Sequence, residues 1–222
     1  MKENKKISRK CLTFFIIKNF IYNYMILGTN GSANNQLRTP RGVTRDDSTG
    51  IIFVTDTGNH RIMKYEVGSL NGILIAGGQG PGTNVTQLNS PRGICYDSLS
   101  NSLFITNYGA NNIIRWKLGD TQWTLIAGSI NGVGGSTSTT LRLPTDFMFD
   151  ILGNMYVVDS LNHRIQFFSP NQFNGTTIAS ITGISGSNNS LLNLPFSIVL
   201  DSQLNMYVAE FYNHRVQKFI RY

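Results

Sequence analysis

Short apolar stretches separated by turn-forming residues follow one another along most of the chain. In the first repeating unit they cover residues 42–45, 51–55, 61–67 and 73–76, with turn sequences such as Asp-Ser-Thr-Gly between them. None of these stretches has the length or the 3.6-residue spacing of an amphipathic helix, so each is predicted to be a β-strand. The second stretch is apolar at successive positions, which indicates a strand buried on both faces.

The same unit occurs four times. Each copy starts with a Leu-X-X-Pro segment, carries an aspartate six residues after the proline, and continues through an apolar strand into an Asn-centred turn. The prolines, at intervals of 51, 53 and 51 residues, are Pro40, Pro91, Pro144 and Pro195. The aspartates, predicted to cap the first tight turn, are Asp46, Asp97, Asp150 and Asp201. Four-stranded units with a period of about 50 residues predict a β-propeller.

The two ends of the chain are predicted to close the propeller. The last copy ends after its third strand, and residues 20–27 lie where the other copies have a fourth strand before the Leu-X-X-Pro segment. An N-terminal strand that completes the last blade would remove two open sheet edges. We therefore predict an all-β propeller of four four-stranded blades over residues 20–222. Its repeats are expected at about 37–87, 88–140, 141–191 and 192–222 plus 20–36.

These copies resemble the NHL repeat, which is named for an Asn-His-Leu segment. The resemblance covers about residues 20–222 and depends on the Pro-Gly start, the strand that ends in Asp, and the Asn-His-Arg-Ile turn. The second copy departs from it, with Asn107 at the strand end and Asn111-Asn112-Ile113 in the turn. Because NHL propellers more often have six blades, the resemblance allows two interpretations: a complete four-bladed ring or a fragment of a six-bladed one.

Charge and composition limit the possible functions only when the N-terminal residues are counted separately from the rest of the chain. The net charge is +7, but residues 1–24 contain six basic side chains and one acidic one and so account for +5 of it. The remaining +2 gives little support to nucleic-acid binding. The two cysteines, Cys11 and Cys95, cannot form a disulfide framework, and three histidines do not match a Cys/His zinc site.

Residues 1–19 form a separate basic and apolar leader. The sequence MKENKKISRK followed by CLTFFII resembles a signal peptide or anchor, but Lys18 interrupts the apolar part and no clear cleavage site follows. Three interpretations stay open: a poor signal or anchor, a disordered or helical leader into the first strand, and a mis-assigned start. The leader favours a secreted or membrane-tethered chain over a cytoplasmic one, and it is the only predicted membrane contact.

The polar residues near the Asn turns are predicted to be structural. The strand-end residues Asp56, Asn107, Asp159 and Glu210 could form a ring of cation ligands, but they are better placed to accept turn N–H groups or to pair with arginines. The histidines belong to separate blades, too far apart to share a metal. The predicted structural set is Asp56, Asn59, His60, Arg61, Asn111, Asp159, Asn162, His163, Arg164, Glu210, Asn213, His214 and Arg215. No metal or cofactor is predicted.

Candidate binding residues lie on the face that carries the long loops. Residues 77–89, 128–142 and 183–193 connect successive copies on the same side as the Asn turns. Arginines flank the prolines there, and the candidate partner-binding residues are Arg38, Arg41, Arg92 and Arg142. The turn residues Arg61, Arg164 and Arg215 either join this surface or pair with neighbouring carboxylates. No nucleophile elbow or phosphate-binding loop is present, so no catalytic residue is predicted.

We therefore predict a monomeric, non-catalytic interaction scaffold that binds a protein or another polymer through its loop-rich face. Similar domains suggest the recognition part of a larger assembly such as a ubiquitin ligase. One alternative is a metal-dependent lyase of the peptide-amidating type, which also has a related propeller. The other is single-stranded RNA binding, for which aromatic residues on the long loops are scarce.

Overall fold

The computed structural model describes residues 29–221, and these residues form four antiparallel sheets. The first sheet contains β1 (Val43–Arg45), β2 (Ile52–Asp56), β3 (Arg61–Tyr65) and β4 (Ile73–Gly77). The second contains β5 (Pro91–Asp97), β6 (Ser102–Asn107), β7 (Asn112–Lys117) and β8 (Thr124–Gly128). The third contains β9 (Asp146–Phe149), β10 (Met155–Asp159), β11 (Arg164–Phe168) and β12 (Thr176–Ala179). The fourth contains β13 (Pro195–Leu200), β14 (Met206–Glu210) and β15 (Arg215–Phe219).

Strand order within every sheet follows the chain, as in the blades of a propeller. The prediction of an all-β propeller is confirmed, and the strands of the first copy lie close to their expected positions. The third strand ends at Tyr65, two residues earlier than expected. The predicted closing strand at residues 20–27 and the leader at residues 1–19 lie outside the described residues. Among residues 29–221 no helix is long and apolar enough to span a membrane.

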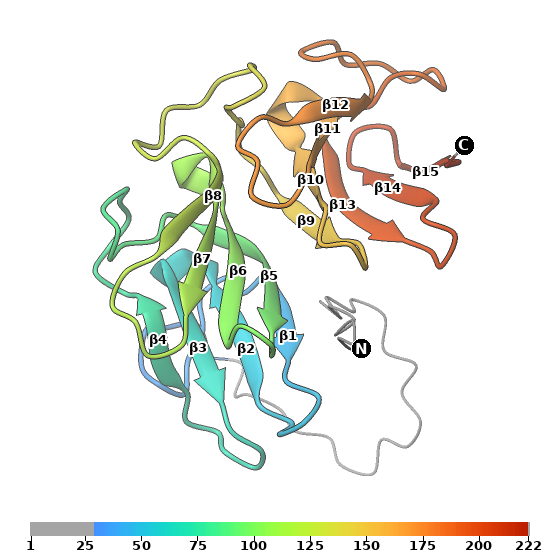
Figure 1. Cartoon of the computed structure of the whole chain (residues 1–222). Coiled ribbons are helices and arrows are strands. Elements are labelled where there is room, and N and C mark those ends of the chain that lie inside the picture. Colours follow the sequence, from blue (N-terminus) through green and yellow to red (C-terminus); the bar gives the residue numbers. More distant parts are fainter. Residues whose placement is uncertain (1–28, 222) are drawn as a thin grey trace, which may run out of the picture.

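Successive sheets stack along an arc, with the inner strands β1, β5, β9 and β13 side by side (Figure 1). We call each interface between consecutive sheets a joint. The face of a sheet toward the next sheet is its trailing face, and the face toward the preceding sheet is its leading face. In the first joint, Phe53, Ile62 and Ala76 of the trailing face pack against Leu88 and Ile105 of the next sheet.

The same packing recurs in the next two joints. The isoleucine that follows the Asn turn is fully buried in each of the first three sheets, at Ile62, Ile113 and Ile165. Each of these side chains contributes about 1.5–3 kcal/mol through burial. Separate apolar clusters join the second sheet to the third and the third to the fourth. The joints therefore supply most of the apolar core of residues 29–221.

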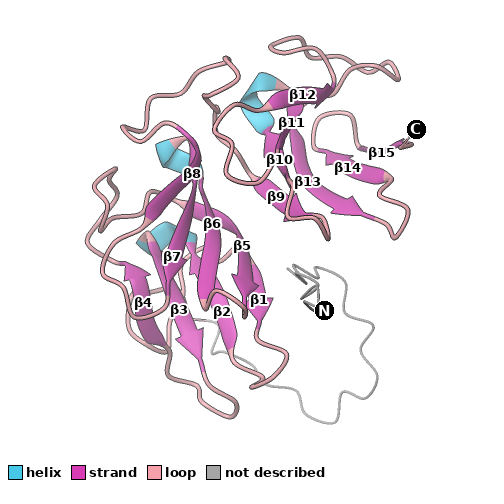
Figure 2. Cartoon of the chain, in the orientation of Figure 1, coloured by secondary structure: helices cyan, strands magenta, loops and turns pink. Residues whose placement is uncertain are grey.

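The Asn turns connect the second and third strands of each sheet, and they are the only helical elements among the described residues (Figure 2). Each turn begins with one 3₁₀ turn in the first three sheets: η1 (Thr57–Asn59), η2 (Tyr108–Ala110) and η3 (Ser160–Asn162). The next residue, which is His60, Asn111 or His163, adopts a left-handed conformation with φ near 54°. Asparagine and histidine tolerate this conformation better than most side chains, which explains why these residue types occur here.

Candidate binding site between the inner strands

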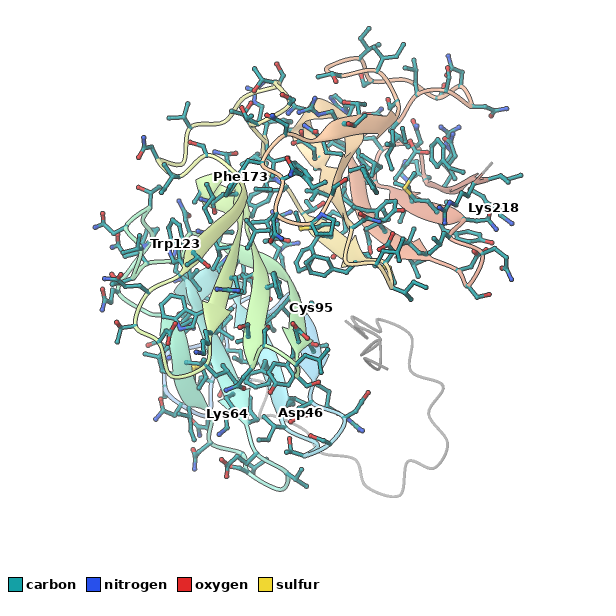
Figure 3. All side chains as sticks on the ribbon, in the orientation of Figure 1. Asp46, Lys64, Cys95, Trp123, Phe173 and Lys218 are labelled. Carbon is teal, nitrogen blue, oxygen red and sulfur yellow. The ribbon has the colours of Figure 1, made fainter. Side chains whose placement is uncertain are left out.

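A pocket of about 220 Å³ lies between the inner strands of all four sheets. Figure 3 labels Cys95 of β5, one of the residues that line it. The residue directly after the repeat proline lines the pocket in every copy: Arg41, Arg92, Thr145 and Phe196. The pocket therefore has a basic side, formed by the first two sheets, and a side with an aromatic and a hydroxyl group, formed by the last two.

The second position after each proline sets the distance between neighbouring inner strands. Gly42 and Gly93 occupy this position in the first two copies, and a Cβ at Gly42 would lie 2.2 Å from the carbonyl oxygen of Arg92. Glycine is required there because backbone from the next sheet fills the space. Thr55 of β2 strengthens the contact, since its hydroxyl donates to the same carbonyl at 2.9 Å.

Asp146 and Ser197 replace glycine at this position in the last two copies. The Ser197 hydroxyl donates to Asp146 Oδ2 at 2.7 Å, and the Ile198 N–H donates to the same oxygen at 3.3 Å. Asp146 itself is partly exposed at the pocket, but protein atoms surround its carboxyl group. This desolvation raises the pKa of Asp146 to about 6, against the opposing effect of the Ser197 hydrogen bond. Near neutral pH the pocket wall therefore contains a titratable carboxyl group.

Arg92 is held in place by aromatic rings. Its guanidinium carbon lies 3.3 Å from the centroid of the Tyr108 ring and 5.9 Å from that of Phe196, distances typical of cation–π contacts. Its Nε is buried and has no hydrogen-bond partner within residues 29–221. Burial is the main cause that lowers the pKa of Arg92, and the positive charge of Arg41 adds to it. The two arginines thus lie close enough to repel each other.

The other two candidate arginines lie elsewhere. Arg142 lines an open pocket of about 460 Å³ at the Asn turns, together with Asn111 and Gly135. The side chain of Arg38 passes beneath Gly58 in the turn of its own sheet, where a Cβ on the glycine would lie 2.6 Å from Arg38 Cγ. Of the four arginines, the structure therefore brings only Arg41 and Arg92 together.

The turn arginines form ion pairs inside the sheets. Arg61 Nε donates to Asp56 at 2.7 Å, and its terminal nitrogen donates to the carbonyl oxygens of Ala33 and Gln36. Arg164 and Arg215 make the same kind of contact with Asp159 and Glu210. These guanidinium groups hold the preceding loop against the sheet. Of the two roles considered for them, pairing with a carboxylate is the one that the geometry supports.

The strand-end acids also bind backbone. Asp56 Oδ1 accepts the Arg38 N–H at 2.6 Å, and Asp159 Oδ1 accepts the Arg142 N–H at 2.7 Å. Their second carboxylate oxygens accept the side-chain amides of Asn59 and Asn162, both at 2.8 Å. In the second sheet Asn107 accepts the equivalent backbone N–H at 2.6 Å without a charge. Each of these side chains fixes the entry into an inner strand.

The turn histidines connect one sheet to the next. His60 Nδ1 accepts the Ser90 N–H at 3.0 Å, and His163 Nδ1 accepts the Leu194 N–H at 3.1 Å. Burial lowers the pKa of both imidazoles, which favours the neutral form that can accept. Asn111 Oδ1 accepts the Leu143 N–H at 2.8 Å in the same way. No group of three or more metal-binding side chains is present in residues 29–221.

The aspartates after each first strand form tight-turn contacts. Asp46 accepts the Ser48 and Thr49 hydroxyls, and these bonds, led by Thr49, lower its pKa. Asp201 accepts both the backbone N–H and the amide of Asn205, and the amide bond is the main cause of its lowered pKa. These residues lie at the opposite end of the sheets from the Asn turns, since they follow β1 and β13.

Sequence reasoning missed Asp146, Tyr108 and Phe196. The available signal was the loss of glycine at the second position after the proline in the last two copies. That loss indicates a different contact between the inner strands. It does not indicate that a carboxyl group takes the place of a glycine beside a pocket.

The comparisons with known proteins agree with this architecture. The family model for the NHL repeat matches residues 37–65, which include β1 to β3 of the first sheet. No curated protein matches the chain. Among solved structures, an auxiliary nutrient binding protein from Bacteroides thetaiotaomicron VPI-5482 is 17% identical with a TM-score of 0.65, and the match covers 82% of this chain and 47% of that one.

Two further solved structures have the same fold. A chain of a nidogen/laminin complex is 21% identical with a TM-score of 0.61, covering 81% of this chain and 59% of that chain. A streptogramin B lyase is 17% identical with a TM-score of 0.56, covering 82% and 51%. The chain spans about half the length of the structures it matches. The repeat match at residues 37–65, the four in-phase copies and the stacked sheets together support an NHL-repeat β-propeller.

Proposed function

We propose that this propeller is a non-catalytic interaction scaffold that binds an acidic segment of a partner protein at the pocket between its inner strands. The observation that carries the proposal is the convergence of Arg41 and Arg92 on one pocket. Neither arginine has an acidic partner among the described residues. The turn arginines Arg61, Arg164 and Arg215, in contrast, are each paired with a carboxylate. The two pocket arginines are therefore available to a ligand.

The environment of Arg92 favours recognition of a carboxylate. Its stacking on Tyr108 holds the guanidinium plane in a fixed direction, and its desolvation increases the benefit of a negatively charged partner. The exposed Phe196 ring on the far wall adds an apolar contact. Such a combination of aromatic and arginine side chains is typical of protein-binding surfaces. The similar propellers in nutrient-binding and laminin-complex structures are in keeping with a binding role.

Fluorescence anisotropy can test this proposal with two labelled probes, a glutamate-rich peptide and a single-stranded oligoribonucleotide of equal charge. Reversing both charges in Arg41→Glu/Arg92→Glu is expected to abolish peptide binding. The matched control is Arg38→Glu/Arg142→Glu, which changes the net charge equally but lies outside the pocket. We expect the control to retain binding within about threefold. Equal losses in the two variants would show non-specific attraction, and binding of the oligoribonucleotide alone would favour the RNA alternative.

A further inference from the structure

We propose that the joint between the second and third sheets binds a small aromatic carboxylate. The site is a second pocket, of about 400 Å³, which we call the joint pocket. It shares no lining residue with the pocket between the inner strands, so this inference does not depend on the proposed function. Its volume is within the range of small-molecule binding sites. Residues from both sheets line it, including Phe104, Arg115, Phe149, Met155, Phe168 and Phe173.

The walls of the joint pocket are rich in aromatic rings. Phe104 of β6 and Phe149 of β9 contact each other edge to face, with ring centroids 4.9 Å apart. Both rings are buried, as is Phe168 of β11. Phe173, which Figure 3 labels in the loop between β11 and β12, is 56% exposed and lines the open side. Because aromatic rings form favourable edge-to-face and offset contacts with other rings, these walls favour a ligand with a flat aromatic group.

The first joint is filled at the equivalent place by larger side chains. Trp116 pairs with Leu103 across its sheet as Phe168 pairs with Met155, so the tryptophan occupies the position of the phenylalanine. Trp116 is 4% exposed and packs in the first joint together with the partly buried Leu118. Two residues after Phe168, the third sheet has an exposed proline at the position of this leucine. The smaller ring and the exposed proline leave space between the second and third sheets.

Arg115 of β7 is the only charged residue among the described residues that line the joint pocket. It lies opposite Phe104 in the register of β6 and β7. Its Nε is buried without a hydrogen-bond partner, and its guanidinium group forms no ion pair within residues 29–221. A buried donor without an acceptor costs free energy, and a carboxylate is the acceptor that best matches a guanidinium group. Arg115 therefore favours a ligand with a carboxylate.

The equivalent positions in the first and third sheets carry no unpaired cation. Lys64 of the first sheet pairs with Glu66 at 2.9 Å. The second sheet has Lys117 in place of this glutamate, so Arg115 lacks the same neighbour. The third sheet has Phe167 at this position, and its ring packs edge to face on a tyrosine of the same sheet. An unpaired cation beside an aromatic pocket is thus specific to the second joint among these three sheets.

Isothermal titration calorimetry of the full chain tests the proposal with two probes, naphthylacetate and its neutral isostere naphthylacetamide. The wild type is expected to bind one naphthylacetate per chain and to bind the amide at least about tenfold more weakly, since the amide has no charge to pair with Arg115. Arg115→Gln is expected to weaken naphthylacetate binding by about the same factor and to leave amide binding unchanged. The matched control is Lys64→Gln, which removes the same charge at the same repeat position of the first sheet. It is expected to leave binding of both probes unchanged.

A filling variant provides a second test. Phe168→Trp introduces the side chain found in the first joint and is expected to abolish binding of both probes, with circular dichroism confirming that the variant folds. Failure of the wild type to bind naphthylacetate at millimolar concentration would overturn the proposal. Equal affinity for the two probes, or equal losses in Arg115→Gln and Lys64→Gln, would also overturn it. Tighter binding of decanoate than of naphthylacetate would overturn the assignment of an aromatic ligand.

Discussion

Replacing Arg164 is expected to destabilise the third sheet more than any other single change in the turns. Arg164 is buried, pairs with the buried Asp159 at 2.8 Å, and donates to the carbonyl oxygens of Ser136 and Thr137 in the preceding loop. Arg164→Asn leaves Asp159 as a buried carboxylate without its counter-charge. Loss of one partner of a buried ion pair costs about 3–5 kcal/mol. In a chain of this size, this corresponds to a decrease of about 6–20 °C in Tm.

The second sheet provides the compensating change. Asn107 and Asn112 occupy the positions of Asp159 and Arg164 there, and Asn112 donates its amide to the Ser129 carbonyl without any charge in the pair. The double variant Asp159→Asn/Arg164→Asn is therefore expected to recover about 2 kcal/mol of the loss, because no buried charge is left unpaired. The loss in Arg164→Asn alone should be smaller at pH 4 than at pH 8, since a protonated Asp159 needs no counter-charge.

Urea unfolding followed by circular dichroism measures these differences, with equal m-values as the condition for comparing the variants. The matched control is Arg215→Asn, because the Arg215 side chain is more exposed than that of Arg164 and its loss should cost less. A double variant no more stable than Arg164→Asn would refute the reasoning. If Arg164→Asn lowers the free energy of unfolding equally at pH 4 and pH 8, then the hydrogen bonds from Arg164 to the loop stabilise the sheet more than its ion pair with Asp159 does.

Three further predictions concern the pocket and the joints. Because the pKa of Asp146 is raised to about 6, the folded state binds its proton more tightly than the unfolded state, so this group's contribution to stability decreases as the pH rises from about 4 to 6. The stability difference between wild type and Asp146→Asn should fall by about 2 kcal/mol over that range in urea titrations; a flat difference would exclude a raised pKa. His163→Asn should change Tm by less than about 2 °C because Asn111 makes the same contact in the second sheet. His163→Ala should lower the free energy of unfolding by about 1–2 kcal/mol. Equal effects of the two substitutions would show that the hydrogen bond to the Leu194 N–H does not stabilise the joint. Gly42→Ala should lower the free energy of unfolding by about 1–3 kcal/mol, because the new Cβ would meet the Arg92 carbonyl oxygen. Calorimetry measures the Tm of this variant, and an unchanged Tm would show that the inner strands can move apart.

The repeat and the strands were predictable because they depend on local chemistry. The prolines, the tight-turn aspartates and the Asn turns each fix a backbone conformation within a few residues, and four in-phase copies make that pattern unambiguous. The pairing of Asp56 with Arg61 follows from β-strand register, since the two residues face each other across β2 and β3.

The pocket was not predictable from the same information. Arg38 lies two residues before Pro40 and Arg41 directly after it, yet one lies beneath a turn and the other at the pocket. Which of them converges with Arg92 depends on how the inner strands of two sheets pack. The packing between two inner strands cannot be predicted from the sequence of a single copy.

The distribution of differences among the copies separates stability from recognition. Positions that build the joints have nearly the same side chain in each copy: the leucine of the Leu-X-X-Pro segment is fully buried at Leu88, Leu141 and Leu192. The position after the proline differs among the copies, with arginine, arginine, threonine and phenylalanine, and all four line the pocket. Equivalent packing requires equivalent residues, whereas a ligand contacts each sheet differently. We therefore expect substitutions of the four residues after the prolines to change binding with little effect on folding.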